Sequence, residues 1–230
     1  TYLELTESLL KNNPVPALVV WPEMALPFYP PSSRYMDVLE QLVTERNLSI
    51  LTGVPWYEIT DRNTKNVRFF NSAILLNQSG KFVGRYDKKH LVPFGEYVPL
   101  KKYLPFLSPL VIAGGDYSKG AIEQPIEWEK AKIGSLICFE SVFSDLSRQW
   151  VRAGANILIS ISNDAWYGKS SAPYQSLAMA VLRAVETRRS LVRSANTGVS
   201  AFINPSGIIE DQSDIFVPWV ATKNVVLCNE

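Results

Sequence analysis

Histidine is nearly absent from this chain of 230 residues, and its scarcity excludes several catalytic designs. The single histidine is His90, so a zinc site built on two or three imidazoles cannot form. Any catalytic triad with a histidine base would have to use this one residue. Chemistry therefore falls to cysteine, carboxylate, lysine or backbone groups, and we expect neither a metal nor a cofactor.

The chain also lacks a charge excess, a disulfide framework and a membrane-spanning segment. Its 23 basic and 22 acidic residues give a formal net charge of +1, without the basic patch that nucleic-acid binding requires. Two cysteines, Cys138 and Cys228, are too few for a disulfide framework. No apolar stretch reaches the roughly 18 residues of a transmembrane helix, and no signal peptide opens the sequence. We expect a soluble piece that does not bind nucleic acid.

What the chain does contain is enough apolar sequence for a large core. Hydrophobic residues make up 47% of it and charged residues 20%, which is typical of a globular protein. No Gly/Ser-rich linker, low-complexity run or internal repeat divides the sequence. We therefore expect residues 1–230 to form a single domain.

The pattern of apolar residues predicts helices and strands that alternate along the chain. Helices are expected at Leu3–Leu10, from a cap at Ser32 or Ser33 through Met36, Leu39, Leu42 and Val43, at Ser141–Ala153 and at Tyr174–Arg189. Strands are expected at Pro16–Trp21, Ser49–Val54, Val67–Leu76, Lys81–Tyr86, Ile122–Ile126, Ala131–Ile137, Asn156–Ile161, Leu191–Ser194, Val199–Asn204, Ile208–Glu210 and Val217–Leu227. This mixture predicts an α/β fold of two layered sheets with helices outside.

Three residues occupy positions that would suit a catalytic pocket, and each also has an ordinary structural explanation. Cys138 ends the predicted strand Ala131–Ile137, where side chains of several strands converge, but a free cysteine also suits a buried core. Glu23 follows the strand Pro16–Trp21, where Pro-Glu is also a common start of a loop. Lys88 is one of three adjacent basic residues, a run that is also typical of a solvated turn.

These residues lie within three of four motifs that follow one another along the chain. The motifs are Trp21-Pro22-Glu23, YDKKHLVPFGE from Tyr86 to Glu96, Ile137-Cys138-Phe139-Glu140 and SNDAWYG from Ser162 to Gly168. Together they resemble the motifs of bacterial apolipoprotein N-acyltransferases, a branch of the nitrilase superfamily. The resemblance continues through RAVE at 183–186 and RSANTG at 193–198, so it covers nearly the whole chain.

The resemblance implies a catalytic set of Glu23, Lys88 and Cys138. Glu23 would be the general base, Lys88 the cation that stabilises the tetrahedral oxyanion, and Cys138 the nucleophile that forms a thioester. Glu96 and Glu140 match further active-site carboxylates of the family. Each would either take part in the chemistry or neutralise a buried lysine, since buried charges need partners.

Other motif residues are expected to support the site or to bind substrate. Trp166 and Tyr167 lie in SNDAWYG and are expected to have this role, whereas His90 is expected only to order its loop through a hydrogen bond. The sequence departs from the common family pattern at Phe139, where many members have Tyr, at Ser176, where His is usual, and at Ser190, where Pro is common. These departures bear on substrate details more than on the core chemistry.

The resemblance also implies a fold, a reaction and a location. The fold would be a nitrilase-like α-β-β-α sandwich, two mixed β-sheets flanked by helices, without the family's first strand and membrane-spanning helices. The reaction would move an acyl chain from a glycerophospholipid to the N-terminal amine of a diacylglyceryl-cysteine lipoprotein. The domain would face the periplasm as part of a bacterial inner-membrane protein.

The apolar segment Leu100 to Ala113 is compatible with a lid that contacts the membrane surface, and equally with packing onto the domain or a partner subunit. Two other functions remain open. One is a soluble amidase of the nitrilase superfamily that hydrolyses a small amide, in which water resolves the thioester. The other is a catalytically silent binding module that keeps the fold.

Overall fold

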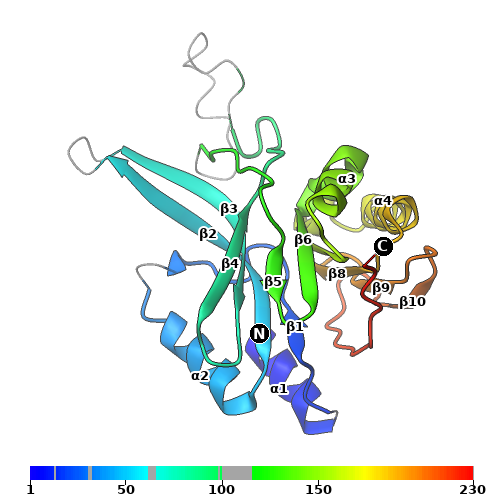
Figure 1. Ribbon diagram of the computed structural model, residues 1–230, viewed down its shortest axis with the longest axis horizontal. Coiled ribbons are helices and arrows are strands. Elements are labelled where there is room, and N and C mark those ends of the chain that lie inside the picture. Colours follow the sequence, from blue (N-terminus) through cyan, green and yellow to red (C-terminus); the bar gives the residue numbers. More distant parts are fainter. Residues whose placement is uncertain (13, 31–32, 62–65, 98, 100–115, 230) are drawn as a thin grey trace.

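Two β-sheets lie between two pairs of α-helices in the computed structural model of the chain (Figure 1). The structure describes residues 1–12, 14–30, 33–61, 66–97, 99 and 116–229. The first sheet has the order β1-β2-β3-β4, and the second has the order β10-β9-β8-β7-β6-β5. The strands are β1 (Leu18–Val20), β2 (Ser49–Asp61), β3 (Asn66–Leu76), β4 (Phe82–Asp87), β5 (Ile126–Trp128), β6 (Ala131–Ile137), β7 (Ile157–Asn163), β8 (Leu191–Asn196), β9 (Ala201–Ile203) and β10 (Ile209–Gln212). Both sheets are mixed, because β1–β2, β6–β7 and β7–β8 are parallel pairs and the other neighbours are antiparallel. The predicted α/β class with two mixed sheets is confirmed.

The helices cover the outer faces of the sheets. Figure 1 shows α1 (Tyr2–Asn12) and α2 (Met36–Arg46) on one side, and α3 (Ser144–Arg152) and α4 (Ala172–Thr187) on the other. Two short 3₁₀ helices, η3 (Cys138–Val142) and η4 (Asp164–Tyr167), directly follow β6 and β7. The layer order is therefore α-β-β-α, as expected from the sequence.

The period-2 alternation of strand residues separates two hydrophobic cores. In β2, Ile50 packs with α2, whereas its neighbour Leu51 packs between the sheets. In β3, Ile74 and Leu75 divide in the same way. The first sheet is thus buried on both faces over these residues, which accounts for the nearly continuous apolar runs in its sequence.

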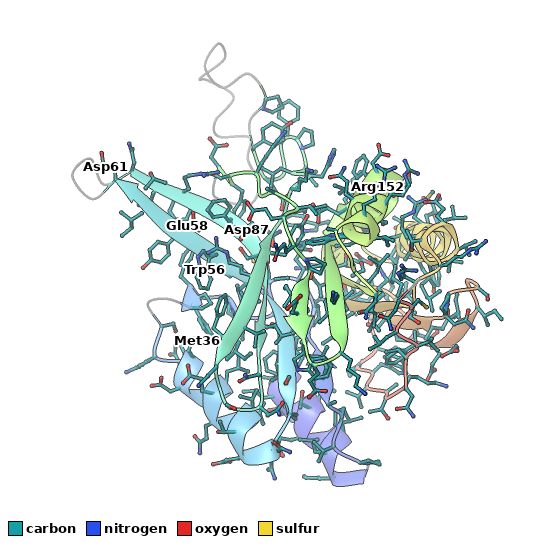
Figure 2. The ribbon with its side chains drawn as sticks, in the orientation of Figure 1. Met36, Trp56, Glu58, Asp61, Asp87 and Arg152 are labelled. Atoms are coloured by element: carbon teal, nitrogen blue, oxygen red, sulfur yellow. The ribbon has the colours of Figure 1, made fainter. Side chains whose placement is uncertain are left out.

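A charged and aromatic cluster on the first sheet fixes the register of its antiparallel strands. Arg85 forms ion pairs with Glu58 and Asp87, and its guanidinium carbon lies 4.8 Å from the ring centroid of Trp56. Figure 2 shows Trp56, Glu58 and Asp87 near one another on this sheet. Because Asp87 ends β4, the cluster sets where the following residue, Lys88, enters the interior.

Several predicted boundaries are wrong; the strand predicted at Ser49–Val54, for example, continues to Asp61 as β2. Of the predicted strand Ile122–Ile126 only Ile126 is in a strand, β5, since Pro125 has no N–H for a ladder. The helix predicted at Ser141–Ala153 is divided at Phe143, whose backbone is extended, into η3 and α3. Ser33 does not cap α2, because its hydroxyl accepts from the N–H of Tyr35, the residue that stands at the cap.

The predicted strand Val217–Leu227 is also wrong. The segment is irregular and contacts the second sheet through separate hydrogen bonds: the carbonyl of Val226 accepts from Ser190 Oγ at 2.8 Å, and the N–H of Cys228 donates to the carbonyl of Asn156 at 3.1 Å. Its apolar residues therefore mark a half-buried extended chain rather than a member of a ladder.

The expected lid, Leu100 to Ala113, lies outside the described residues. None of the helices in the described ranges is both long enough and apolar enough to cross a bilayer.

Trp150 offers a test of this packing. Its indole is 1% exposed, donates from Nε1 to the carbonyl of Ser135 at 2.7 Å and meets the ring of Tyr86 edge-on. We expect Trp150→Phe to lower the free energy of unfolding by about 2–3 kcal/mol, because it leaves a buried carbonyl unpaired and a cavity beside it. In urea unfolding, the matched change Trp166→Phe, at a side chain 66% exposed, should cost less than about 0.5 kcal/mol. Equal effects of the two changes would contradict this account of the core.

Candidate active site

Cys138 stands at a sharp turn between β6 and η3. Its φ of 56° lies in the left-handed region, which costs a non-glycine residue about 1–3 kcal/mol and is found mostly at functional sites. The residue before it ends the buried strand β6, and the residues after it form η3. This turn leaves the Cys138 side chain half-buried, although Ile137 is completely buried.

Glu140 holds this turn against the loop that carries Lys88. One carboxylate oxygen accepts from the Tyr86 hydroxyl and from the N–H groups of Lys89 and His90, at 2.8–2.9 Å. The other accepts from the N–H of Ile137 at 2.8 Å. Burial raises the pKa of Glu140 to about 7, although these N–H groups oppose the shift. Glu140 therefore joins the end of β4 to the end of β6.

Lys88 is a fully interior cation. Its side chain is 1% exposed, and Nζ lies 3.0 Å and 2.9 Å from the two oxygens of Glu96 and 3.8 Å from Oε1 of Glu23. Burial by itself would lower the pKa of Lys88, but the nearby charges of Glu23, Cys138 and Glu96 outweigh it and the net shift is upward. Lys88 is therefore charged at neutral pH. Glu96 neutralises this buried lysine, which is one of the two roles expected for it.

Glu23 follows the end of β1 and comes close to Lys88. The backbone at Glu23 packs directly on Gly53 of β2, where an added Cβ atom would come within 2.5 Å of the Glu23 Cα. Its carboxylate accepts from Asn71 Nδ2 at 2.7 Å and from the N–H of Asn163, at the end of β7, at 2.8 Å. Burial raises the pKa of Glu23, against the lowering effects of Lys88, Asn71 and the Asn163 N–H.

The thiol of Cys138 is electrostatically coupled to both of these charges. Burial raises its pKa to about 12, the charge of Glu23 adds to the rise, and Lys88 opposes it. The resting sulfur is therefore a neutral thiol at neutral pH, and Lys88 is an ammonium. The structure thus brings together Glu23, Lys88 and Cys138, which follow three different strands.

Asn71 is a site residue that sequence reasoning missed. Its Nδ2 donates to Glu23 at 2.7 Å and to Glu96 at 2.9 Å, and its carbonyl accepts from the N–H of Lys88 at 2.8 Å. Asn71 lies inside β3 and outside the four sequence motifs. The available signal was a polar residue at the middle of an apolar strand, where a buried amide requires partners.

A second polar group lies on the sheet behind the sulfur. Ser162 follows Ile161, which is the register partner of Ile137, so Ser162 is the neighbour of Cys138 across the parallel pair β6–β7. The Ser162 hydroxyl donates to Asp164, and Asp164 forms a buried ion pair with Arg193 at 3.0 Å. All three residues lie in motifs that the sequence analysis quoted without giving them roles.

The remaining predicted residues lie at the rim. Burial raises the pKa of the Tyr167 phenol, and the Cys138 charge adds to the rise, so Tyr167 is near the sulfur. Trp166 is 66% exposed and faces solvent. His90 orders its loop through its main-chain N–H, as described for Glu140, and its ring packs on Phe143 at a centroid distance of 3.8 Å.

In the part of the chain that the structure describes, no group of three or more His, Cys, Asp or Glu side chains is arranged to hold a metal ion. A separate groove of about 1340 Å³ lies between α1, β1, β8 and residues 216–225. Glu23, Lys88 and Cys138 are not among the residues that line it, so the groove and the candidate site are different features.

Solved structures with the same fold belong to the nitrilase superfamily. A member of branch 10 of that superfamily from Saccharomyces cerevisiae superposes with a TM-score of 0.70 and 20% identity over 93% of this chain and 78% of that one. A carbon-nitrogen hydrolase from Helicobacter pylori gives a TM-score of 0.68 and 18% identity over the same shares of the two chains. The predicted nitrilase-like sandwich is thereby confirmed.

Curated relatives are more similar in sequence. A protein of Geobacter metallireducens named apolipoprotein N-acyltransferase is 46% identical over 91% of this chain, and one of the same name from Pseudomonas aeruginosa is 36% identical over 91%. In both cases the chain spans 40% of the relative's length. The family description of carbon-nitrogen hydrolases matches residues 2–217, nearly all of the sequence. This chain belongs to the carbon-nitrogen hydrolase family.

Proposed function

We propose that the chain is the catalytic domain of an N-acyltransferase. It moves an acyl chain from a glycerophospholipid, through a thioester on Cys138, to the N-terminal amine of a diacylglyceryl-cysteine lipoprotein. The observation that carries the proposal is the Cys138 thiol beside a buried Glu23–Lys88–Glu96 cluster, in a chain whose relatives carry that name. We further propose that residues 1–230 are one domain on the periplasmic side of the inner membrane, with Leu100 to Ala113 as a lid toward the lipid.

The first step needs a proton transfer that is unfavourable in water. A thiol of pKa about 8.5 and a carboxyl of pKa about 4.3 differ by roughly four units, or on the order of 6 kcal/mol. Burial of Glu23 raises its pKa, and the ammonium of Lys88 favours the thiolate. Both effects make Glu23 a better base for Cys138 without a histidine.

The thiolate then attacks the ester carbonyl of the phospholipid. The oxygen of the tetrahedral intermediate takes a negative charge, which the ammonium of Lys88 stabilises because it is fixed in a site of low dielectric. When the C–O bond breaks, the lysophospholipid leaves as an alcohol with the proton that Glu23 had taken from sulfur. The acyl group remains on Cys138 as a thioester.

The second step repeats this chemistry with an amine. The N-terminal amine of the lipoprotein attacks the thioester carbonyl and gives its proton to Glu23, and Lys88 again faces the oxyanion. The C–S bond breaks to form the amide, and the proton returns to the sulfur of Cys138. Glu23 therefore serves as base and acid in both halves of the reaction.

Hydrolysis of a small amide is the alternative, since solved amidases share the fold, among them one from a Nesterenkonia species with a TM-score of 0.63. The same residues would form the thioester, and water would replace the amine. The two functions differ in the acyl donor and in whether an amine or water resolves the acyl-enzyme.

An acyl-labelled phospholipid tests both functions. We expect the wild-type chain to retain the label on Cys138 until a lipopeptide amine is added, with the transfer rate reduced at least about 10³-fold in Cys138→Ser. Cys228→Ser is the matched control and should retain the label, because Cys228 lies away from the cluster, near Asn156. Intact-protein mass spectrometry measures the acyl group. Turnover of small amides without lipid acylation would favour the amidase and reject the transferase.

The pH dependence of acylation tests the role of Glu23. Glu23 acts as a base only when ionised and its pKa is raised above 4.5, so the single-turnover rate should fall as pH drops through that raised pKa. Glu96 contributes to the rise through its charge. Glu96→Gln should therefore move this acid limb to lower pH, and it should reduce the maximal rate by about tenfold or more because Lys88 loses its closest partner.

Stopped-flow acylation across pH measures both effects. Glu127→Gln is the matched control, since Glu127 is exposed on β5, and it should leave the profile unchanged. An acid limb that stays in place in Glu96→Gln would mean that Glu23 does not govern it.

A further inference from the structure

We propose that Ser162 is a positioning residue for the nucleophile: its hydroxyl donates to Asp164 in the resting enzyme and turns to donate to the Cys138 sulfur as the thiolate forms. The proposal rests on the assignment of Cys138 as nucleophile. It goes beyond that assignment because it adds a hydrogen-bond donor, from the end of β7, that acts on the sulfur.

The parallel register of β6 and β7 places this hydroxyl beside the sulfur. Ile137 and Ile161 are register partners, so the next residues, Cys138 and Ser162, are neighbours at the ends of the two strands. Ser162 is 1% exposed, and its hydroxyl is near enough to the sulfur that a hydrogen bond from it lowers the pKa of Cys138. The fold therefore fixes their distance through the backbone ladder rather than through a mobile loop.

A hydroxyl has one proton, so Ser162 can donate to only one acceptor at a time. In the resting structure that acceptor is Oδ1 of Asp164. The other oxygen of Asp164, Oδ2, accepts from Arg193 at 3.0 Å, so the guanidinium compensates the charge of this carboxylate. The Ser162 hydroxyl can therefore turn away from Asp164 without leaving an unpaired buried charge behind.

The surroundings hold Asp164 and Arg193 rigidly. The guanidinium of Arg193 also donates to the carbonyl of Val199 at 3.1 Å and to Ser160 Oγ at 3.4 Å. Gly198 lies so close that a Cβ atom would come within 2.0 Å of Asp164 Oδ2. Since both charged groups are buried and held by these contacts, rotation of the Ser162 hydroxyl is the smallest adjustment available at the site.

The charged and titratable groups that act on the sulfur come from three directions. Glu23 follows β1, Lys88 follows β4, and Asp164 and Tyr167 belong to η4. When the proton of the Cys138 thiol passes to Glu23, the new thiolate gains the Ser162 hydrogen bond and keeps the field of Lys88. No covalent proton transfer involves Ser162.

Alkylation by iodoacetamide tests the proposal in the full chain, because only the thiolate reacts. The rate at Cys138 is read by peptide mass spectrometry as a function of pH, with Cys228 in the same sample as internal reference. We expect Ser162→Ala to raise the apparent pKa of Cys138 and to slow its alkylation about tenfold at pH 8, the size of one hydrogen bond to a charged group. Ser162→Thr keeps the hydroxyl and should retain the wild-type rate.

Ser135→Ala is the matched control. Ser135 is a buried serine on β6, and its hydroxyl has no hydrogen-bond partner among the described residues, so its loss should leave the rate unchanged. If Ser162→Ala does not fold, Ser162→Cys supplies a side chain of similar size that is a weak donor, and it should slow alkylation by a smaller factor. An unchanged or faster rate in a folded Ser162→Ala or Ser162→Cys variant would overturn the proposal.

This readout is independent of acyl transfer. A slowed alkylation in a chain that never acylates would support the Ser162 inference and reject the proposed function. Normal acylation of the wild type with unaltered alkylation in Ser162→Ala would support the proposed function and reject the Ser162 inference.

Discussion

A lysine ammonium inside the protein is the constraint on which the rest of the site depends. Lys88 is almost wholly removed from water, and an unpaired charge in such a place would cost many kcal/mol. Glu96 and Glu23 compensate it from two different segments, and Asn71 bridges both carboxylates. The ends of β1 and β4 and the middle of β3 therefore have to meet at this point for the fold to be stable.

The same charge balance makes the site chemically competent. With the positive charge fixed between two carboxylates, any negative charge that develops on sulfur or on a carbonyl oxygen meets a cation that need not reorganise. Glu23 is held in place by the Asn163 N–H from the second sheet, so the proposed base on one sheet is fixed relative to the proposed nucleophile on the other. The contacts that stabilise the buried Lys88 in the fold are thus the same contacts that would support the proposed reaction.

Glu140 has a structural part in this arrangement. It accepts four hydrogen bonds, three of them from backbone N–H groups on either side of the site, and so holds the strained Cys138 turn against the Lys88 loop. A backbone conformation that costs free energy persists only where its surroundings enforce it. The carboxylate of Glu140 supplies that enforcement without exposure to solvent.

Elements with strong local signals were predictable from the sequence. The helix expected at Tyr174–Arg189 and the strands expected at Val67–Leu76 and Lys81–Tyr86 were found, because their apolar periodicity can be read from neighbouring residues. The irregular segment at Val217–Leu227 was mistaken for a strand, since apolar residues alone do not reveal whether a ladder partner is present. Asn71 was missed for a related reason: its partners, Glu23 and Glu96, lie far from it in sequence.

The sequence by itself determined which groups were available for chemistry and the ends of which strands carry them. With one histidine, the order of Glu23, Lys88 and Cys138 in their motifs pointed to a thiol, a carboxylate and an ammonium. Only the tertiary structure decided that these groups meet, that the lysine is buried and that Ser162 and Asp164 stand behind the sulfur. The reason is that such contacts join residues as far apart as Glu23 and Asn163, 140 positions along the chain, and distance through the fold is not encoded in any local pattern.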